Sequence, residues 1–266
     1  MTHIDSQAIV SEKAILGQDV RIEAGAVVEA GAIIGDRCII RSHAVVTGSV
    51  QMGEGNLIGY GAIIGADPQD VNYRGENALV KIGDNNVIRE YVTIHRGSRD
   101  GGITQIGSRC FFMVGAHVAH DCHVEDEVVL VNHVLLAGHV KVGRRAFLGG
   151  AAVVHQHVRI GRLAILRGNI AVGKDVPPFA MAVGTNAVSG LNRVGLRRAG
   201  ISEQVRRELE KIFFILYREG LNRAQALEKI KGLDWKSSEA FEFIEFVEKT
   251  RRGICRFYKG EDFIAE

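Results

Sequence analysis

The segment AHVAHDCHV, residues 116–124, carries three histidines at three-residue spacing, His117, His120 and His123, with Asp121 and Cys122 beside them. Imidazole can act as a general base near neutral pH, and a carboxylate can orient it. The same groups can also hold a metal ion. The segment therefore fits acid–base catalysis, a metal centre or a row of solvated side chains, and the fold that carries it has to decide among them.

A six-residue repeat extends through the first two thirds of the chain. Counting in sixes from Val10 to Val172 gives 28 positions, of which 25 are apolar. A small residue such as Ala14 or Ala26 often stands two positions earlier, and residues two apart share one face of a strand. The pattern predicts one short strand per hexad, with glycine-marked corners between strands. Three hexads then form one coil of about 18 residues, stacked at ~4.8 Å on the next coil.

Hexapeptide runs of this kind resemble the left-handed parallel β-helix of bacterial acyltransferases, and the resemblance implies that all-β fold. The three polar exceptions to the repeat, Asp70, Glu76 and Asp100, fall in DPQDVNYRGEN (67–77) and SRDGG (98–102). Both insertions return to the same six-residue frame. We expect them to form loops that leave the coil prism and carry functional residues.

A helical pattern follows the end of the repeat. ISEQVRRELEKIFFILYREG has an apolar stripe at helical spacing, with Ser202 as a candidate N-cap and Gly220 as a stop. Two shorter helices are expected at 222–231 and 238–251. This region is also basic, because residues 193–223 hold eight Lys or Arg against four Glu.

The bulk composition is that of an ordinary soluble protein, with 266 residues, 46% hydrophobic content and a formal charge of +2. We expect a β-helix domain at residues 1–189 and a small α-helical C-terminal domain at residues 190–266. No apolar run approaches the roughly 18 residues of a membrane span, and the N-terminus lacks the pattern of a signal peptide, so a cytoplasmic location is expected. The balanced charge argues against nucleic-acid binding. Four cysteines without a CxxC pair are expected to be reduced.

An 18-residue coil converts sequence spacing into geometry, because residue n lies beneath residue n+18. His120 then lies beneath Gly138 and Gln156, and Asp121 lies beneath His139. A base at 120, a carboxylate at 121 and a backbone N–H at 138 could converge on one substrate atom. Acyl transfer to an alcohol requires this arrangement.

Plainer interpretations apply to other histidines and cysteines. Solvated corners are expected for His43, His123 and His133, and packing in the small inward position for Cys38, Cys110 and Cys122. For His95 and His155, the role of a corner residue and a functional role fit the sequence equally well. A metal site is the principal rival, because left-handed β-helices include the γ-class carbonic anhydrases, whose histidines bind one metal between two subunits. We expect no metal, since His117 and His120 point in different directions from their coil.

Several motifs resemble the UDP-N-acetylglucosamine O-acyltransferase family that begins lipid A synthesis: TIHRG (93–97), AHVAHDC (116–122), LAGHV (136–140), VVHQ (153–156), DVPPF (175–179) and GLRRAG (195–200). The resemblance covers nearly the whole chain. It implies transfer of a 3-hydroxyacyl group from acyl carrier protein to the glucosamine 3-hydroxyl of UDP-N-acetylglucosamine. It also implies no cofactor beyond the phosphopantetheine that the donor carries.

The resemblance assigns roles to individual residues. His120 matches the general base, Asp121 its orienting carboxylate and Gly138 the oxyanion donor, in agreement with the coil geometry. Substrate-binding residues are implied at Gln69, Asp70, Asn72, His117, His139, His155, Gln156, Asn192 and Arg198. A further glycine, Gly168, would leave room for a long acyl chain.

Three positions depart from the family pattern. Asn72 stands where the family usually has Lys, Ala199 where it tends to have Arg, and His157 where an aromatic residue usually follows Gln156. The last departure leaves open an acceptor with an amine at the 3-position, whose product would be an amide. The length of the acyl chain is also left open.

Two expected surfaces indicate binding to other protein chains. Arg206, Arg207 and Lys211 lie within about two turns of the first predicted helix, and we expect them to dock the acidic carrier protein. The coil prism has large flat faces, and a neighbouring subunit packed against one of them would enclose the corner histidines. We therefore expect a homotrimer.

Overall fold

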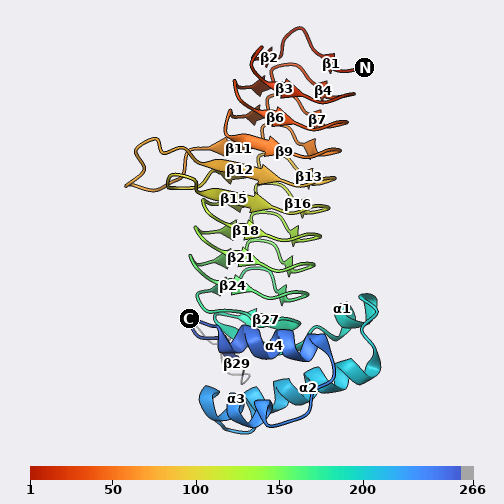
Figure 1. Ribbon diagram of the computed structural model, residues 1–266, viewed down its shortest axis with the longest axis vertical. Coiled ribbons are helices and arrows are strands. Elements are labelled where there is room, and N and C mark those ends of the chain that lie inside the picture. Colours follow the sequence, from red (N-terminus) through yellow and green to blue (C-terminus); the bar gives the residue numbers. More distant parts are fainter. Residues whose placement is uncertain (259–266) are drawn as a thin grey trace.

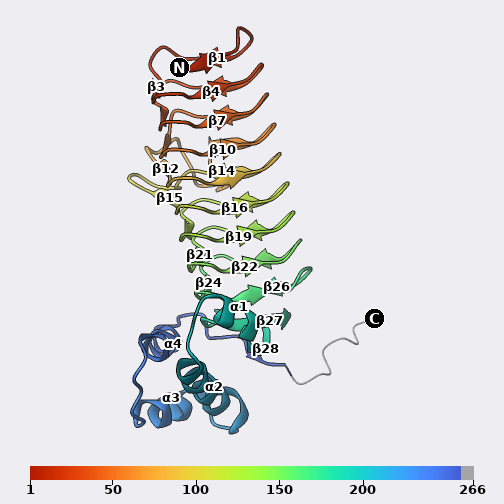
Figure 2. The same cartoon turned by 90° about the vertical axis from the view of Figure 1, so that its right-hand side faces the viewer.

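The computed structural model describes residues 1–258, in which short strands stack into a triangular prism with a helical region at one end (Figures 1 and 2). The residues 259–266 of the predicted C-terminal domain lie outside the described part. Three sheets of 12, 9 and 8 strands form the three sides, and every strand pair is parallel except β27–β28. We name these sides sheet A, sheet B and sheet C.

The strands of each side are every third strand of the chain, except at the end of sheet A, where β27, β28 and β29 follow β25. Sheet A holds β1 (His3–Ile4), β4 (Arg21–Ile22), β7 (Ile39–Ile40), β10 (Leu57–Ile58), β13 (Val87–Ile88), β16 (Phe111–Phe112), β19 (Val129–Leu130), β22 (Phe147–Leu148), β25 (Ile165–Leu166), β27 (Ala180–Gly184), β28 (Ala187–Leu191) and β29 (Arg256–Phe257). Sheet B holds β2 (Ile9–Val10), β5 (Val27–Val28), β8 (Val45–Val46), β11 (Ile63–Ala66), β14 (Thr93–His95), β17 (His117–Val118), β20 (Leu135–Leu136), β23 (Val153–Val154) and β26 (Ala171–Val172). Sheet C holds β3 (Ile15–Leu16), β6 (Ile33–Ile34), β9 (Val50–Met52), β12 (Leu79–Ile82), β15 (Ile103–Ile106), β18 (His123–Val124), β21 (Lys141–Val142) and β24 (Arg159–Ile160).

The six-residue repeat forms the core of the prism. The repeat positions point inward, and Ile40, Ile58, Ile64 and Leu130, for example, are fully buried. The small residues two positions earlier are buried with them, as Ala44 is. Cys38, Cys110 and Cys122 pack there, as predicted, and Cys255 is buried outside the repeat; all four cysteines are free.

The strand register shows where the coil is interrupted. His117 pairs with Leu135, at the expected offset of 18 residues. Leu57 pairs with Val87, 30 positions along, because the coil between them also contains the loop at 67–77. Val87 pairs with Phe111, 24 positions along, because of the loop at 98–102. The insertions therefore add two hexads and one hexad, which confirms that they return to the same frame.

Both loops leave the prism where sheet B passes into sheet C. The loop at 67–77 lies between β11 and β12 and projects sideways from the prism, and the loop at 98–102 lies between β14 and β15 (Figure 1). We call this edge the B–C corner.

Four helices follow the coils: α1 (Arg193–Arg198), α2 (Glu203–Arg218), α3 (Arg223–Lys231) and α4 (Ser238–Glu248). The three predicted helices correspond to α2, α3 and α4. Ser202 caps α2 by accepting a hydrogen bond from the Val205 amide, as predicted, and Gly220 just beyond its end has φ +73°. The short α1 was not predicted, and neither were β28 and β29.

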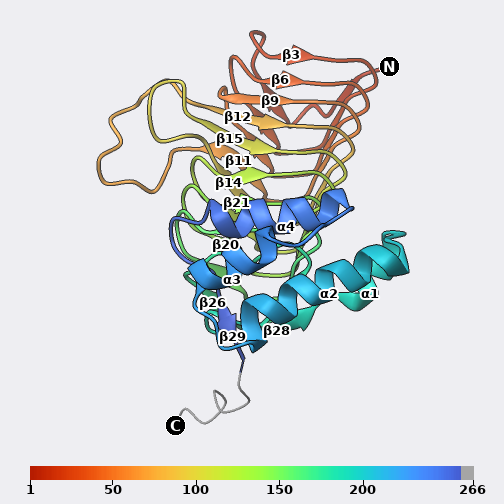
Figure 3. The same ribbon diagram turned by 60° about the horizontal axis from the view of Figure 1, so that its bottom comes forward.

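The helical region closes the C-terminal end of the prism (Figure 3). Arg159 on β24 donates a hydrogen bond to the Phe246 carbonyl of α4, at 2.8 Å, and Arg162 donates to Glu242, at 2.9 Å. The predicted boundary between residues 189 and 190 stays a prediction, and β28 crosses it. No helix within residues 1–258 combines the length and apolar character that crossing a bilayer requires.

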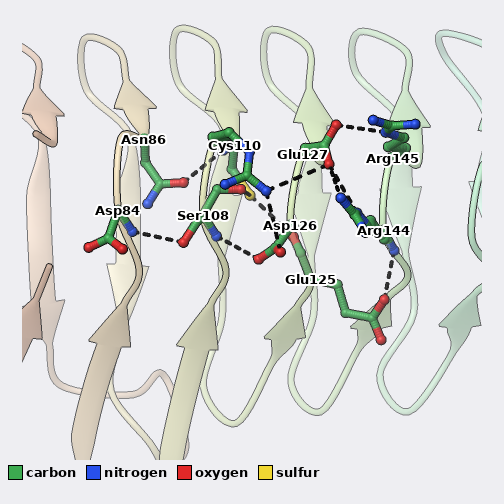
Figure 4. A network of polar contacts seen from close by, with 10 residues as sticks. Asp84, Asn86, Ser108, Cys110, Glu125, Asp126, Glu127, Arg144 and Arg145 are labelled. Carbon is green, nitrogen blue, oxygen red and sulfur yellow. Dashed lines mark hydrogen bonds and ion pairs between the residues drawn. The ribbon is translucent and has the colours of Figure 1, made fainter. Parts of the chain in front are cut away.

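A ladder of polar side chains runs along the corner between sheets C and A (Figure 4). The Asp84 amide donates to Ser108 Oγ, and the Ser108 amide donates to Asp126, at 2.9 and 2.8 Å. Beside it, the fully buried Asn86 accepts from the Cys110 amide at 2.7 Å and donates to Asn56 Oδ1. Neighbouring coils are therefore joined by side chains as well as by strand pairing.

Replacing Asn86 with alanine should lower the free energy of unfolding by about 1–3 kcal/mol, because the buried Cys110 amide loses its acceptor. Urea denaturation at one fixed protein concentration measures the change. Asn77→Ala, at an exposed loop residue, is the control and should change the free energy of unfolding by less than about 0.5 kcal/mol. Equal denaturation midpoints for the wild type and Asn86→Ala would contradict the role assigned to this ladder.

Candidate active site

The B–C corner holds most of the residues that could do chemistry. Strand β17 ends at residue 118 and β18 begins at 123, so residues 119–122 form the turn between them. Asp121, His139 and His157 occupy equivalent turn positions in successive coils, with φ of +57°, +61° and +63°. Their repeated left-handed backbone stacks the three side chains in one column along the corner. The predicted column of Asp121 beneath His139 is confirmed.

A histidine–aspartate dyad lies in this turn. His120 Nδ1 is 2.9 Å from Asp121 Oδ2, and both side chains are nearly buried. Ser98 donates to the same oxygen from its hydroxyl, at 2.7 Å, and from its amide, at 3.1 Å. Burial by itself would raise the pKa of Asp121, but the hydrogen bonds from Ser98 and His120 outweigh it and hold this pKa below its ordinary value. The carboxylate is therefore ionised at neutral pH.

The ionised carboxylate sets the tautomer of the imidazole. Because Asp121 accepts from Nδ1–H of His120, the other ring nitrogen, Nε2, carries a free lone pair. That nitrogen lies over Gly138: a Cβ at Gly138 would be 2.5 Å from His120 Cε1 and 2.6 Å from Nε2. Any side chain at position 138 would collide with the ring, so the close approach requires glycine.

The backbone amide of Gly138, a buried residue, has no acceptor in the described chain. On the corner between sheets C and A, the amides of Gln18, Ser108 and Arg144 in the same turn position donate to carboxylates of a neighbouring coil, and no carboxylate accepts from Gly138 in this way. A base nitrogen and a vacant amide therefore lie together at one turn, as an alcohol acylation site needs.

His139 lines the other side of the dyad. Its Nε2 is 3.8 Å from Asp121 Oδ2, its ring meets that of His120 edge to face, and it stacks on His157 with centroids 4.5 Å apart. Burial lowers the pKa of His139, and His157, His120 and Arg99 lower it further against the opposing effect of Asp121. Ligand atoms of His120, Asp121 and His139 lie within 4.8 Å of one another, so these groups could also hold a metal ion.

Two further histidines lie behind the dyad. Thr93 Oγ1 and His117 Nδ1 are 2.7 Å apart, and His117 meets His95 edge to face. His95 is only 7% exposed, and its Nδ1 has no hydrogen-bond partner among the described residues. Burial, with smaller effects of His117 and His120, lowers the pKa of His95 to about 4. Burial and His120 also lower the pKa of His117. Both rings are therefore neutral at pH 7.

Several predicted substrate-binding residues lie away from the dyad within one chain. Gln69, Asp70 and Asn72 lie on the projecting loop, where Asp70 accepts a hydrogen bond from the Asn72 amide. Gln156 and His155 are exposed at the corner two coils along from the dyad, and His155 Nδ1 is 3.3 Å from the Gln156 carbonyl.

Other predicted residues belong to the C-terminal region. Asn192 is buried, caps α1 by accepting from the Gly195 amide and donates to the Leu163 carbonyl, while Arg198 is exposed at the end of α1. Gly168 lies at the corner between sheets A and B, not at the B–C corner, and a Cβ there would be 3.0 Å from the Gly150 carbonyl oxygen.

The predicted carrier-docking cations on α2 have local partners. Arg206 donates to the Ile201 carbonyl at 2.7 Å, Arg207 pairs with Glu203 at 2.5 Å, and Lys211 lies 5.7 Å from the centre of the Trp235 ring. Their role in docking stays a prediction.

Sequence reasoning missed the groups that hold Asp121. Ser98 contacts its carboxylate, and Thr104 Oγ1 accepts from its amide at 2.8 Å. The loop at 98–102 was expected to be functional, but an offset of 18 residues does not place Ser98 beside Asp121. Ser98 lies beside Asp121 at an offset of 23 residues, close to the 24 residues that this coil spans with its loop. The repeat gives only the approximate offset, because the loop adds one whole hexad but its own conformation places Ser98.

Comparisons with known proteins support the same chemistry. The family model described as Udp N-acetylglucosamine O-acyltransferase, Domain 2 matches residues 175–255, and the bacterial transferase hexapeptide model matches residues 13–48. A curated acyl-(acyl-carrier-protein)–UDP-N-acetylglucosamine O-acyltransferase from Thermodesulfovibrio yellowstonii is 42% identical over 258 residues, covering 96% of this chain and all of the relative. One from Gloeothece citriformis is 44% identical over 186 residues, covering 70% of this chain and 67% of the relative.

Solved structures give the same result. UDP-N-acetylglucosamine acyltransferases from Bacteroides fragilis and Francisella novicida each match with a TM-score of 0.92 and 34% identity, covering 95% and 98% of this chain and 100% and 95% of those chains. The predicted left-handed parallel β-helix with C-terminal helices is confirmed, and the acyltransferase interpretation is supported rather than the carbonic anhydrase alternative. The chain belongs to the acyl-(acyl-carrier-protein)–UDP-N-acetylglucosamine O-acyltransferase family.

Proposed function

We propose that this chain transfers a 3-hydroxyacyl group from acyl carrier protein to the 3-hydroxyl of UDP-N-acetylglucosamine, in the cytoplasm, as the first step of lipid A biosynthesis. The observation that carries this proposal is the His120–Asp121 dyad, whose free nitrogen lies over the vacant Gly138 amide. The names of the relatives support the two substrates.

The reaction follows from the positions of these groups. His120 Nε2 takes the proton of the acceptor hydroxyl while its oxygen forms a bond to the thioester carbonyl carbon. The carbonyl oxygen becomes an oxyanion and accepts the Gly138 N–H. When the intermediate collapses, the carbon–sulfur bond breaks and the thiolate of the donor receives the proton from the imidazolium. Throughout, the Asp121 carboxylate stabilises the positive charge on His120.

The direct test is to incubate the protein with UDP-N-acetylglucosamine and a series of 3-hydroxyacyl carrier proteins. Mass spectrometry should detect an O-acylated UDP-sugar and free carrier thiol in equal amounts. The 3-amino analogue of the sugar serves as a parallel acceptor, since the stacked His139 and His157 line the site where the chain departs from its family. Absence of acyl transfer to either acceptor from every chain length would refute the proposed function.

His120→Ala should lower kcat by about 10² to 10⁴, because the acceptor hydroxyl loses its base. Steady-state kinetics with saturating substrates measure the effect. His123→Ala, three residues along the same segment, is the matched control and should retain nearly full activity. Asp121→Asn should cost less than His120→Ala, because His120 keeps a hydrogen-bond partner but loses the neighbouring negative charge.

The catalytic base would be His139 instead of His120 if His120→Ala kept more than about a tenth of wild-type kcat while His139→Ala abolished transfer. Circular dichroism and light scattering of each variant confirm that a loss of activity does not arise from a loss of fold or assembly.

We also propose that transfer requires no metal, although His120, Asp121 and His139 could together hold one. A thioester is already an activated acyl donor, so a base and one oxyanion donor suffice. Extensive dialysis against EDTA should leave kcat unchanged, as measured by the same assay. A loss of activity on chelation that stoichiometric zinc restores would establish a metal mechanism in its place.

A homotrimer is proposed from the outer faces of the prism. The outward residues of sheets A and B are largely apolar, including Val87, Phe147, Leu135 and Val153, each more than a third exposed. Most outward residues of sheet C from β9 onward are polar. Gly168 and His120 also lie at different corners of one chain, so a shared acyl-chain site requires a second copy.

Light scattering at micromolar concentration should give three times the mass of one chain. Replacing Leu135 with glutamate should weaken association, because a charge then faces the apolar surface of the neighbour. Lys81→Glu, on sheet C, is the control and should stay a trimer. A wild-type monomer under these conditions would refute the proposed assembly.

A further inference from the structure

The Asp121 carboxylate is held from one side by the loop at 98–102. Ser98 donates to Asp121 Oδ2 from its hydroxyl at 2.7 Å and from its amide at 3.1 Å. His120 Nδ1 lies 2.9 Å from the same oxygen, so three donors converge on Oδ2. Within residues 1–258 no other side-chain hydroxyl donates a hydrogen bond to this carboxylate. The Ser98 hydroxyl is therefore the shortest of the three contacts, and a single substitution can remove it.

The second carboxylate oxygen of Asp121 also lies against this loop. A Cβ at Gly102 would be 2.9 Å from Asp121 Oδ1, so the backbone of the loop approaches this oxygen closely. The fully buried Thr104 instead fixes the main chain of the same residue, because its Oγ1 accepts from the Asp121 amide at 2.8 Å. Thr104 therefore holds the backbone of Asp121, whereas Ser98 and Gly102 hold its carboxylate.

Hydrogen bonds that do not involve the dyad anchor the loop at 98–102. The Asp100 carboxylate accepts from the Asn77 amide at 3.0 Å, and the Asn77 carbonyl accepts from the Gly101 amide at 2.9 Å. None of these bonds uses the Ser98 side chain. A substitution of Ser98 should therefore keep the conformation of the loop and remove one contact to Asp121.

The orientation of the carboxylate matters for the base. Asp121 Oδ2 has to face Nδ1–H of His120, because this bond leaves Nε2 free to take a proton. As transfer proceeds His120 gains a positive charge, which the carboxylate stabilises only while it stays against the ring. His139 Nε2, at 3.8 Å from Oδ2, is too distant to hold the carboxylate by a hydrogen bond. The orientation of the carboxylate then depends on Ser98.

We propose that Ser98 is a positioning residue for the reaction, which holds the Asp121 carboxylate against His120 from the loop at 98–102. The inference rests on the proposed function and gives the dyad a third member that acts through Asp121 and does not touch substrate. An uninterrupted coil would supply no such donor, since the residue at an offset of 18 from Asp121 is Ile103. The inserted hexad supplies the hydroxyl instead.

The first test is steady-state transfer from a 3-hydroxyacyl carrier protein to UDP-N-acetylglucosamine. Ser98→Ala should lower kcat about tenfold, because a hydrogen bond to a charged group is lost, and should leave the KM for both substrates unchanged. Ser98→Thr keeps the hydroxyl and should retain roughly half of wild-type kcat or more. Ser98→Cys has nearly the same size but a weak donor, so its kcat should fall to that of Ser98→Ala.

Ser108→Ala is the matched control. The Ser108 side chain also joins two coils, by accepting from the Asp84 amide at 2.9 Å, but it lies on the corner between sheets C and A (Figure 4). This variant should keep the kcat and both KM values of the wild type. A loss of kcat equal to that of Ser98→Ala would show a general effect of loosened coils and would overturn the inference.

A double-mutant cycle tests whether Ser98 acts through Asp121. Ser98→Ala should cost about tenfold in kcat in the wild-type background, but less than about twofold in an Asp121→Ala background, where no carboxylate is left to position. An equal cost in both backgrounds would overturn the inference, because Ser98 would then act on the substrate or on the loop.

A measurement without substrates separates this inference from the proposed function. In protein labelled with ¹⁵N-histidine, the Nδ1–H resonance of His120 is identified by its absence in His120→Ala. Its exchange with water should be roughly tenfold faster in Ser98→Ala than in the wild type, because the acceptor is no longer held.

The exchange experiment has distinct outcomes for the two proposals. Equal exchange rates would refute the role of Ser98 even in an active enzyme, as would a wild type in which this resonance is missing. Faster exchange in Ser98→Ala, in a protein that transfers no acyl group, would refute the proposed function and support the positioning of Asp121 by Ser98.

Discussion

The stacking of parallel coils in a fixed register is the constraint on which the rest of the structure depends. Each coil side is only a few residues long, and its stability comes from the buried repeat positions and from hydrogen bonds to the coils above and below. Any residue that left the frame would place polar side chains inside the prism. The chain therefore accommodates polar segments only by extruding them as whole hexads at one corner. That corner is where the dyad lies.

The same stacking produces the electrostatic environment of the dyad. Strand pairing holds Ser98, Thr104 and Asp121 in neighbouring coils, so that the carboxylate is nearly buried and yet accepts enough hydrogen bonds to stay ionised. The surrounding imidazoles of His95, His117 and His139 are kept neutral by burial. The Asp121 carboxylate then stabilises the positive charge that His120 gains when it takes the acceptor proton during transfer.

The sequence alone predicted the coil fold and the contacts between residues one coil apart, because both depend on a period that can be counted. It predicted the column of Asp121 and His139 for the same reason. Ser98 was missed because its offset includes a loop, and the conformation of a loop does not follow from the repeat. The separation of Gly168 from His120 was also missed. The six-residue period gives the position of a residue within its hexad. Which of the three corners the residue occupies depends on how many hexads precede it. β29 pairs with β28 from a distance of more than sixty residues, and no local pattern signals such a pairing.

The return of the chain to sheet A has a consequence for aggregation. After the helices, the Cys255 amide donates to the Asp175 carbonyl and β29 pairs with β28, so the returning chain adds backbone partners at the C-terminal end of sheet A. Among the strands of residues 1–258, β1, β2 and β3 are the first of their sheets and have no strand beyond them, so they are open edges. An open edge is a template for pairing with another molecule. Because the helical region closes the C-terminal end of the prism, strand pairing between two molecules is favoured at the N-terminal edges, and a pair joined there presents only helix-covered ends.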